Sequence, residues 1–100
     1  MTYMSSDDEQ VRAGLESLRE DIDVIDLKIV EELAESVRER RKIAEKIGAY
    51  KKQHEIPVRD QGREGKVISD RRERGRSKGL PGDMIERLFK DIIADAREHE

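Results

Sequence analysis

An uninterrupted helical pattern over residues 10–53 constrains this chain more than any other feature. The segment contains no proline, and its apolar residues recur mostly at steps of three and four, the spacing of one helical face. At 1.5 Å per residue such a helix would span roughly 60 Å, whereas a compact 100-residue domain has a radius of gyration of about 13 Å. One chain cannot bury this stripe alone, so we predict an intertwined helical homodimer. The stripe comprises Leu15, Leu18, Ile22, Ile25, Ile29, Leu33, Val37, Ala44 and Ile47.

The composition agrees with a small domain that needs a partner. Charged residues make up 45% of the chain and apolar residues 34%, which is little material for a private core in a chain below about 150 residues. Low hydrophobicity is also the signature of disorder, but disordered chains combine it with high net charge and lack periodicity. This chain has a net charge of -3 and a strong helical period. We therefore predict an all-α fold.

Several functional classes are disfavoured. The chain has no cysteine, which excludes disulfides and thiolate metal sites, and His54 and His99 lack a second ligand at metal spacing, so we expect no metal site. Twenty-one basic side chains are outnumbered by 24 acidic ones, which argues against nucleic acid as a partner. No apolar run approaches the ~20 residues of a membrane span and residues 1–10 are too polar for a signal peptide, so we expect a cytoplasmic protein.

Local signals place the start and end of the first helix. Ser6 and Glu9 fit a capping box, so this helix is predicted to begin near Asp7, and it is predicted to end near His54. In domain terms, we expect a flexible lead-in over residues 1–9 and a single helical domain over residues 10–100.

Two breaks then separate three helices. The connector 56–60 contains a proline, and Asp60 at its end can cap a second helix that runs to about Lys78. A second break over residues 79–83 precedes a third amphipathic helix that continues to the C-terminus. The predicted order is therefore long helix, shorter helix, helix.

Two cations interrupt the apolar side of the first helix. Arg40 lies on the row that carries Leu33 and Ile47, and Lys51 is eleven residues further along than Arg40. Eleven residues turn a helix to within about 20° of whole turns, so both cations share a face about 16 Å apart. They can be surface residues whose charged ends reach solvent or pair with acids of neighbouring helices, or they can line a site.

The motifs around these cations identify a resemblance. Residues 57–60 read Pro-Val-Arg-Asp and are followed by Arg63-Glu64, after a first helix with Leu-Arg-Glu-Asp-Ile-Asp at 18–23 and Arg-Arg-Lys-Ile-Ala at 40–44. In this order and spacing the chain resembles the all-helical chorismate mutase family over about residues 15–97. The resemblance implies a dimer of three-helix chains whose long first helices cross between subunits, with shared active sites.

The resemblance also implies a function and a set of site residues. Members convert chorismate, a small dianion, to prephenate in aromatic amino-acid biosynthesis without a cofactor. Arg40 and Arg63, together with Arg19 of the other subunit, would clamp the two substrate carboxylates, and Lys51 would donate to the ether oxygen. The substrate's ring hydroxyl would be held by Glu64 and the backbone of Asp60.

Three positions depart from the family pattern. Four extra residues lie between Asp26 and Arg40, and a helical insertion of this length would add about 6 Å and rotate the rest of the helix by about 40° relative to Arg19. Ala96 stands where relatives often have a serine that helps one substrate carboxylate. Glu100 falls where many relatives have a glutamine, and some a glutamate, opposite the catalytic lysine, so it too is a predicted catalytic and substrate-binding residue.

Two alternatives stay open. An isochorismate-pyruvate lyase of the same fold also needs a cationic pocket around a chorismate-like dianion, and product analysis separates it from a mutase. A non-catalytic helical dimerisation module would use the stripe as a coiled-coil seam and the arginines as rim charges. Such a module would have no activity to lose when Arg63 is changed to alanine.

Overall fold

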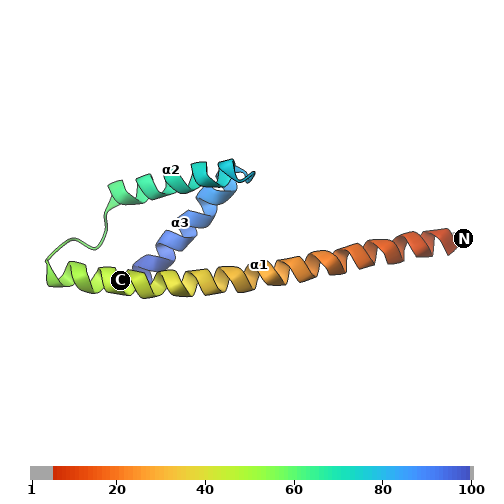
Figure 1. The fold of residues 1–100 in the computed structure, drawn as a ribbon, viewed down its shortest axis with the longest axis horizontal. Coiled ribbons are helices and arrows are strands. Elements are labelled where there is room, and N and C mark those ends of the chain that lie inside the picture. The colour runs from red at the N-terminus through yellow and green to blue at the C-terminus, as the bar shows by residue number, and fades with distance from the viewer. Residues whose placement is uncertain (1–5, 100) are drawn as a thin grey trace, which may run out of the picture. The chain divides into compact units, whose positions relative to one another are not determined.

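The computed structural model describes residues 6–99. Within them the chain forms three helices, α1 Ser6–Gln53, α2 Gln61–Ser77 and α3 Gly82–His99 (Figure 1). The chain divides into two compact units, residues 1–36 and residues 37–100. Among the described residues no helix is both long enough and apolar enough to cross a membrane. The all-helical architecture with a long first helix is confirmed.

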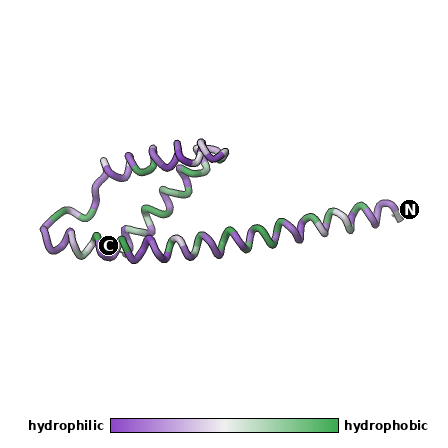
Figure 2. Tube along the Cα trace, in the orientation of Figure 1, coloured by the Kyte–Doolittle hydropathy of each residue, from purple (hydrophilic) through white to green (hydrophobic). Residues whose placement is uncertain are grey.

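In the N-terminal unit, α1 presents an uncovered apolar face. The helix begins at Ser6, inside the segment predicted as a lead-in, and Asp7, Asp8 and Glu9 place negative charge in the first turn, where the helix dipole favours it. Every residue over 7–33 is exposed, and hydrophobic residues recur along this part of α1 (Figure 2). Ile22, for example, is 59% exposed. The helix continues without a break through the four-residue insertion.

In the C-terminal unit, α2 and α3 pack against each other. Gly75 is buried at their contact, and a Cβ added there would clash with Cγ1 of Ile85, so only glycine permits this approach. Gly79 ends α2 with a positive φ of 87°, which glycine adopts readily. The N–H of Gly79 donates to the Arg76 carbonyl at 3.0 Å and that of Leu80 to the Gly75 carbonyl at 2.9 Å, the pattern of a Schellman cap.

The third helix begins inside the segment 79–83, which was predicted as a break between helices. The carbonyl of Pro81 accepts from the N–H of Ile85 at 3.3 Å, so α3 starts at Gly82. Asp83 therefore lies in the first turn, where its carboxylate accepts a hydrogen bond from Arg72 at 2.5 Å. This bond and the charge of Arg72 hold the pKa of Asp83 below its ordinary value. Gly82 was predicted to interrupt the helix, but it is tolerated because it lies in the first turn, where backbone N–H groups have no partner within the helix.

All three helices contribute buried residues to this unit, and a side-chain pair links α1 to α3. Arg41 of α1 donates two hydrogen bonds to Asp95 of α3, from Nε at 2.9 Å and from Nη2 at 2.6 Å. This two-bond pair fixes the end of α3 against the last turns of α1 and also holds the pKa of the Asp95 carboxyl below its usual value. The buried apolar residues come from all three helices and are Ala44, Val67, Ile85, Ile93 and Ala96.

Candidate active site

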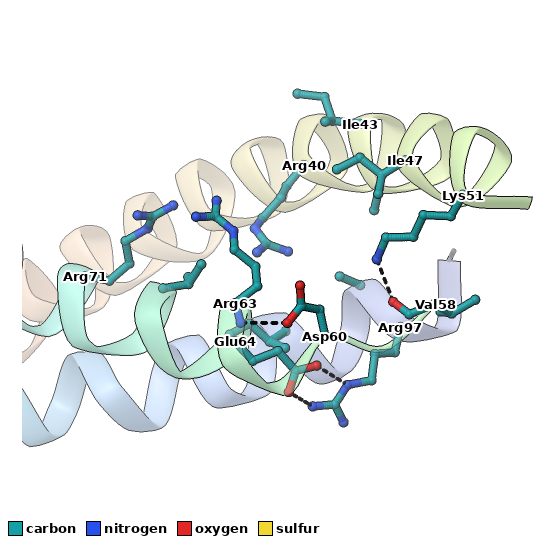
Figure 3. A pocket seen from close by; sticks show the side chains of 14 residues that line it. Arg40, Ile43, Ile47, Lys51, Val58, Asp60, Arg63, Glu64, Arg71 and Arg97 are labelled. Atoms are coloured by element: carbon teal, nitrogen blue, oxygen red, sulfur yellow. Dashed lines mark hydrogen bonds and ion pairs between the residues drawn. The ribbon is translucent and has the colours of Figure 1, made fainter. Parts of the chain in front are cut away.

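One cavity of about 410 Å³ lies within the C-terminal unit, between the end of α1, the connector and helices α2 and α3 (Figure 3). Its volume is in the range of small-molecule sites, and its walls combine apolar side chains with several charged ones. The charged lining residues are Arg40, Lys51, Asp60, Arg63, Glu64, Arg71 and Arg97, and the others are Ile43, Ala44, Ile47, Val58, Val67, Ile93 and Ala96.

The end of α1 fixes Lys51. Glu55 adopts a positive φ of 55°, and the N–H of Ile56 donates to the Lys51 carbonyl at 2.8 Å, which closes the helix with a Schellman-type turn. The chain then folds back, and Nζ of Lys51 donates to the carbonyl of Val58 at 2.6 Å. An ammonium group has three donors, so this bond orients Lys51 and leaves two donors for a ligand.

Arg40 and Arg63 face each other across the cavity. They come from α1 and α2, and their guanidinium groups point toward one another in Figure 3. Neither group makes a hydrogen bond or ion pair with another residue over 6–99. Asp60 positions Arg63, because its Oδ1 accepts from the backbone N–H of Arg63 at 3.0 Å and thereby caps α2. Two guanidinium groups with unused donors in one cavity are suited to bind a carboxylate ligand.

Glu64 places a carboxylate at the cavity wall. Arg97 donates to it from Nε at 2.9 Å and from Nη2 at 2.7 Å, and the Glu64 side chain is only 19% exposed. These hydrogen bonds, with the charges of Arg97 and Arg59, hold the pKa of the Glu64 carboxyl below its usual value. The carboxylate therefore stays ionised and keeps lone pairs for a ligand hydroxyl. Within residues 6–99 the nearby backbone N–H of Asp60 donates to no protein group.

The cavity brings together most of the side chains predicted from the sequence. Arg40, Lys51, Asp60, Arg63 and Glu64 all line it. Arg19 lies in the N-terminal unit, where it donates to Glu16 at 2.7 Å, and is not among the lining residues. Glu100 lies outside the described residues. The roles of all seven residues stay predictions.

Three further lining residues that contribute polar groups were not predicted as part of the site. Arg71 shares one face of α2 with Arg63 and Val67, so the helical spacing contained a signal for it. Arg97 pairs with a residue 33 positions away, and no local pattern indicates such a pair. Val58 contributes its backbone carbonyl, which the side-chain pattern does not reveal.

Comparison with known proteins gives a family match. The profile of the chorismate mutase type II family matches residues 18–100, most of the chain. A curated relative, the T-protein of Enterobacter agglomerans, is 26% identical over 88 residues. This alignment covers 88% of the present chain and 22% of the T-protein. No solved structure gives a significant match.

Proposed function

This chain belongs to the chorismate mutase type II family, and we propose that it catalyses the rearrangement of chorismate to prephenate. The observation that carries the proposal is the cavity in which Arg40, Arg63 and Lys51 converge around apolar walls. These three cations come from two helices, and the two guanidinium groups make no hydrogen bond or ion pair within residues 6–99. Such a site suits a small dianion with an apolar carbon frame.

The proposed reaction needs no nucleophile. Chorismate rearranges by an intramolecular pericyclic shift in which a carbon–oxygen bond breaks while a carbon–carbon bond forms. The protein must hold a flexible dianion in its compact form and stabilise the negative charge that grows on the ether oxygen. Both tasks call for fixed cations and hydrogen-bond donors in a site with little water.

The roles proposed for the cavity residues derive from these needs. Arg40 and Arg63 bind the substrate carboxylates through their planar guanidinium groups. Lys51 donates to the ether oxygen, because the Val58 carbonyl already orients its ammonium group. Glu64 accepts a hydrogen bond from the ring hydroxyl, and the backbone N–H of Asp60 donates to the same hydroxyl.

Arg97 is a further element of this proposal as a positioning residue. Its two hydrogen bonds fix the Glu64 carboxylate and keep it ionised. An ionised carboxylate accepts a strong hydrogen bond from the hydroxyl, whereas a protonated carboxyl group is a weaker acceptor. Arg97 therefore acts on substrate binding through Glu64.

The homodimer belongs to the same proposal. The uncovered apolar face of residues 7–33 supports it, because a second chain would remove this face from water. We propose that Arg19 of the partner subunit contributes to the carboxylate clamp and that Glu100 takes part in catalysis with Lys51. The predicted cytoplasmic location remains a prediction.

The test is an assay of chorismate loss with identification of the product. The proposal predicts prephenate as the product of the purified protein without an added cofactor. Release of pyruvate from isochorismate, without prephenate formation from chorismate, would assign the lyase activity instead. No turnover of either substrate by a correctly folded dimer would assign a non-catalytic module.

A further inference from the structure

Arg71 lines the cavity but has no role in the proposed mechanism. It lies four residues after Val67 and eight after Arg63, so the three side chains share one face of α2. Figure 3 shows Arg71 on the same side of the helix as Arg63. Its side chain is 38% exposed, which is less than that of a freely solvated arginine. The cavity therefore contains a third guanidinium group of its own chain beside Arg40 and Arg63.

The protein pairing of Arg71 leaves most of its donors available. Nη1 donates to Oδ2 of Asp70 at 2.5 Å, and Asp70 is the preceding residue, is 65% exposed and does not line the cavity. Exposed ion pairs contribute little to stability, so this contact is easily exchanged for a ligand. A guanidinium group has five N–H donors, and only one of those of Arg71 is used within residues 6–99.

The other lining residues supply few hydrogen-bond donors for the substrate carboxylates. Two substrate carboxylates present four oxygens, each able to accept more than one hydrogen bond. Ala96 contributes no donor, and Arg97 is held by Glu64. Within this chain the carboxylates therefore depend on the remaining cations of the lining.

The geometry of chorismate selects the carboxylate in question. Its ring carboxylate is opposite the ring hydroxyl, whereas the ether side chain is on the carbon next to that hydroxyl. Glu64, the proposed partner of the hydroxyl, lies in the first turn of α2, and Arg71 lies seven residues, or roughly 10 Å, further along the helix axis. A substrate held by Glu64 at one end directs its ring carboxylate toward the other end of the cavity.

We propose that Arg71 binds the ring carboxylate of the substrate, as the third arginine that the chain around the cavity itself contributes to the clamp. The inference rests on the proposed function for the identity of the ligand. On binding, the guanidinium group exchanges its contact with Asp70 for the ligand carboxylate. The group that binds the ring carboxylate then comes from the same chain as Glu64, whereas Arg19 comes from the partner subunit.

A comparison of two ligands tests this contact directly. The first probe is a bicyclic ether dicarboxylate that mimics the rearranging geometry, and the second is its methyl ester at the carboxylate equivalent to that of the ring. Calorimetry gives the Kd of each probe for the wild type and for Arg71→Leu. The dicarboxylate should bind the variant about tenfold more weakly, as expected for the loss of a hydrogen bond between charged groups. Esterification should weaken binding to the wild type by a similar factor and binding to Arg71→Leu by less than about threefold.

The matched control is Arg74→Leu, which removes the same charge from an exposed position of α2 outside the cavity lining. Its Kd for the dicarboxylate should stay within twofold of the wild type. Equal losses in the two leucine variants, or an ester penalty as large in Arg71→Leu as in the wild type, would overturn the proposal. If Arg71→Leu fails to fold by circular dichroism, Arg71→Met takes its place, since methionine is also uncharged and suits a helix. A Kd within twofold of the wild type in the methionine variant, together with an undiminished ester penalty, would equally overturn it.

Turnover of chorismate by the wild type is measured separately. Binding of the dicarboxylate through Arg71 without any turnover would refute the proposed function and support the contact. Turnover together with unaltered binding in Arg71→Leu would support the function and refute the contact.

Discussion

Lys51 is held at the point where α1 ends. Its carbonyl accepts the N–H that closes the helix and its ammonium group donates to Val58, so both ends of the residue are fixed before a ligand arrives. Helical periodicity was sufficient to predict that Arg40 and Lys51 share a face, because spacing within one helix is set by backbone geometry. The contact with Val58 could not be predicted in the same way, because it depends on how the connector folds back.

Replacement of Lys51 tests its role at the ether oxygen. Lys51→Ala should lower kcat by several hundredfold or more, since loss of one preorganised donor at a developing oxyanion typically costs about 10² to 10³. Steady-state kinetics give this value. The matched control is Lys52→Ala, which removes an exposed cation outside the cavity and should leave kcat within twofold. A fall of less than threefold for Lys51→Ala would mean that the donor is another group.

The pairing of Glu64 with Arg97 predicts a pH dependence. Arg97 lowers the pKa of Glu64, so the carboxylate stays ionised as the pH falls. It becomes protonated only at a pH below the ordinary pKa of a glutamate. Arg97→Met removes the two hydrogen bonds, so the pKa of Glu64 should rise and the acid limb of kcat/KM should move to higher pH. In Arg97→Lys the acid limb of kcat/KM should lie at a pH between those of the wild type and Arg97→Met.

The control for this prediction is Glu64→Gln, whose amide oxygen can accept but cannot titrate. The contribution of Glu64 to the acid limb should disappear in that variant. An acid limb at the same pH in the wild type and in Arg97→Met would show that Arg97 does not control the ionisation of Glu64.

At the scale of elements, the helices were predictable but their packing was not. Periodicity and cap residues placed α1 and α2 within about two residues of their observed ends, since both signals are local. The start of α3 at Gly82 lies inside the predicted break over residues 79–83, because the glycine occupies the first turn of the helix. The contact between Gly75 and Ile85 depends on the approach of two helices, and the sequence of either helix alone does not contain it.

Two glycines of α2 give opposite expectations. A Cβ at Gly75 would clash with Ile85, so Gly75→Ala should destabilise the protein by about 1–3 kcal/mol through overpacking. Gly65 has nothing within 4 Å of its virtual Cβ, so Gly65→Ala should stabilise the protein by about 0.4–1 kcal/mol through better helix propensity and a less flexible unfolded chain. Urea denaturation measures both changes. Equal effects in the two variants would contradict the close approach of α2 and α3.

At the scale of the whole molecule, the sequence predicted a partner chain from the length of the first helix. The structure of the single chain leaves the residues over 7–33 exposed, which agrees with the prediction that a second copy covers them. Light scattering at micromolar concentration should give the mass of a homodimer. A folded monomer would contradict the prediction.

The role of Arg19 is decided by mixing chains. If Arg19 acts across the interface, Arg19→Ala and Lys51→Ala homodimers should each be weakly active, and mixed dimers should regain one intact site. If the helical insertion instead displaces Arg19 from the site, Arg19→Ala should cost little activity. Mixed dimers are detected by a difference in tag between the two chains. Mixed dimers that form but recover no activity would refute the assignment of Arg19 to the partner's site.

The central claim is that the cavity of the C-terminal unit is a chorismate mutase site. The most direct measurement is the rate of prephenate formation from chorismate, monitored by nuclear magnetic resonance, for the wild type and for Arg63→Ala at the same dimer concentration. We expect prephenate from the wild type and a loss of kcat/KM of at least about tenfold in Arg63→Ala, as for loss of a hydrogen bond between charged groups, with assembly unchanged. Equal rates for the two proteins, or no prephenate from the wild type, would contradict it.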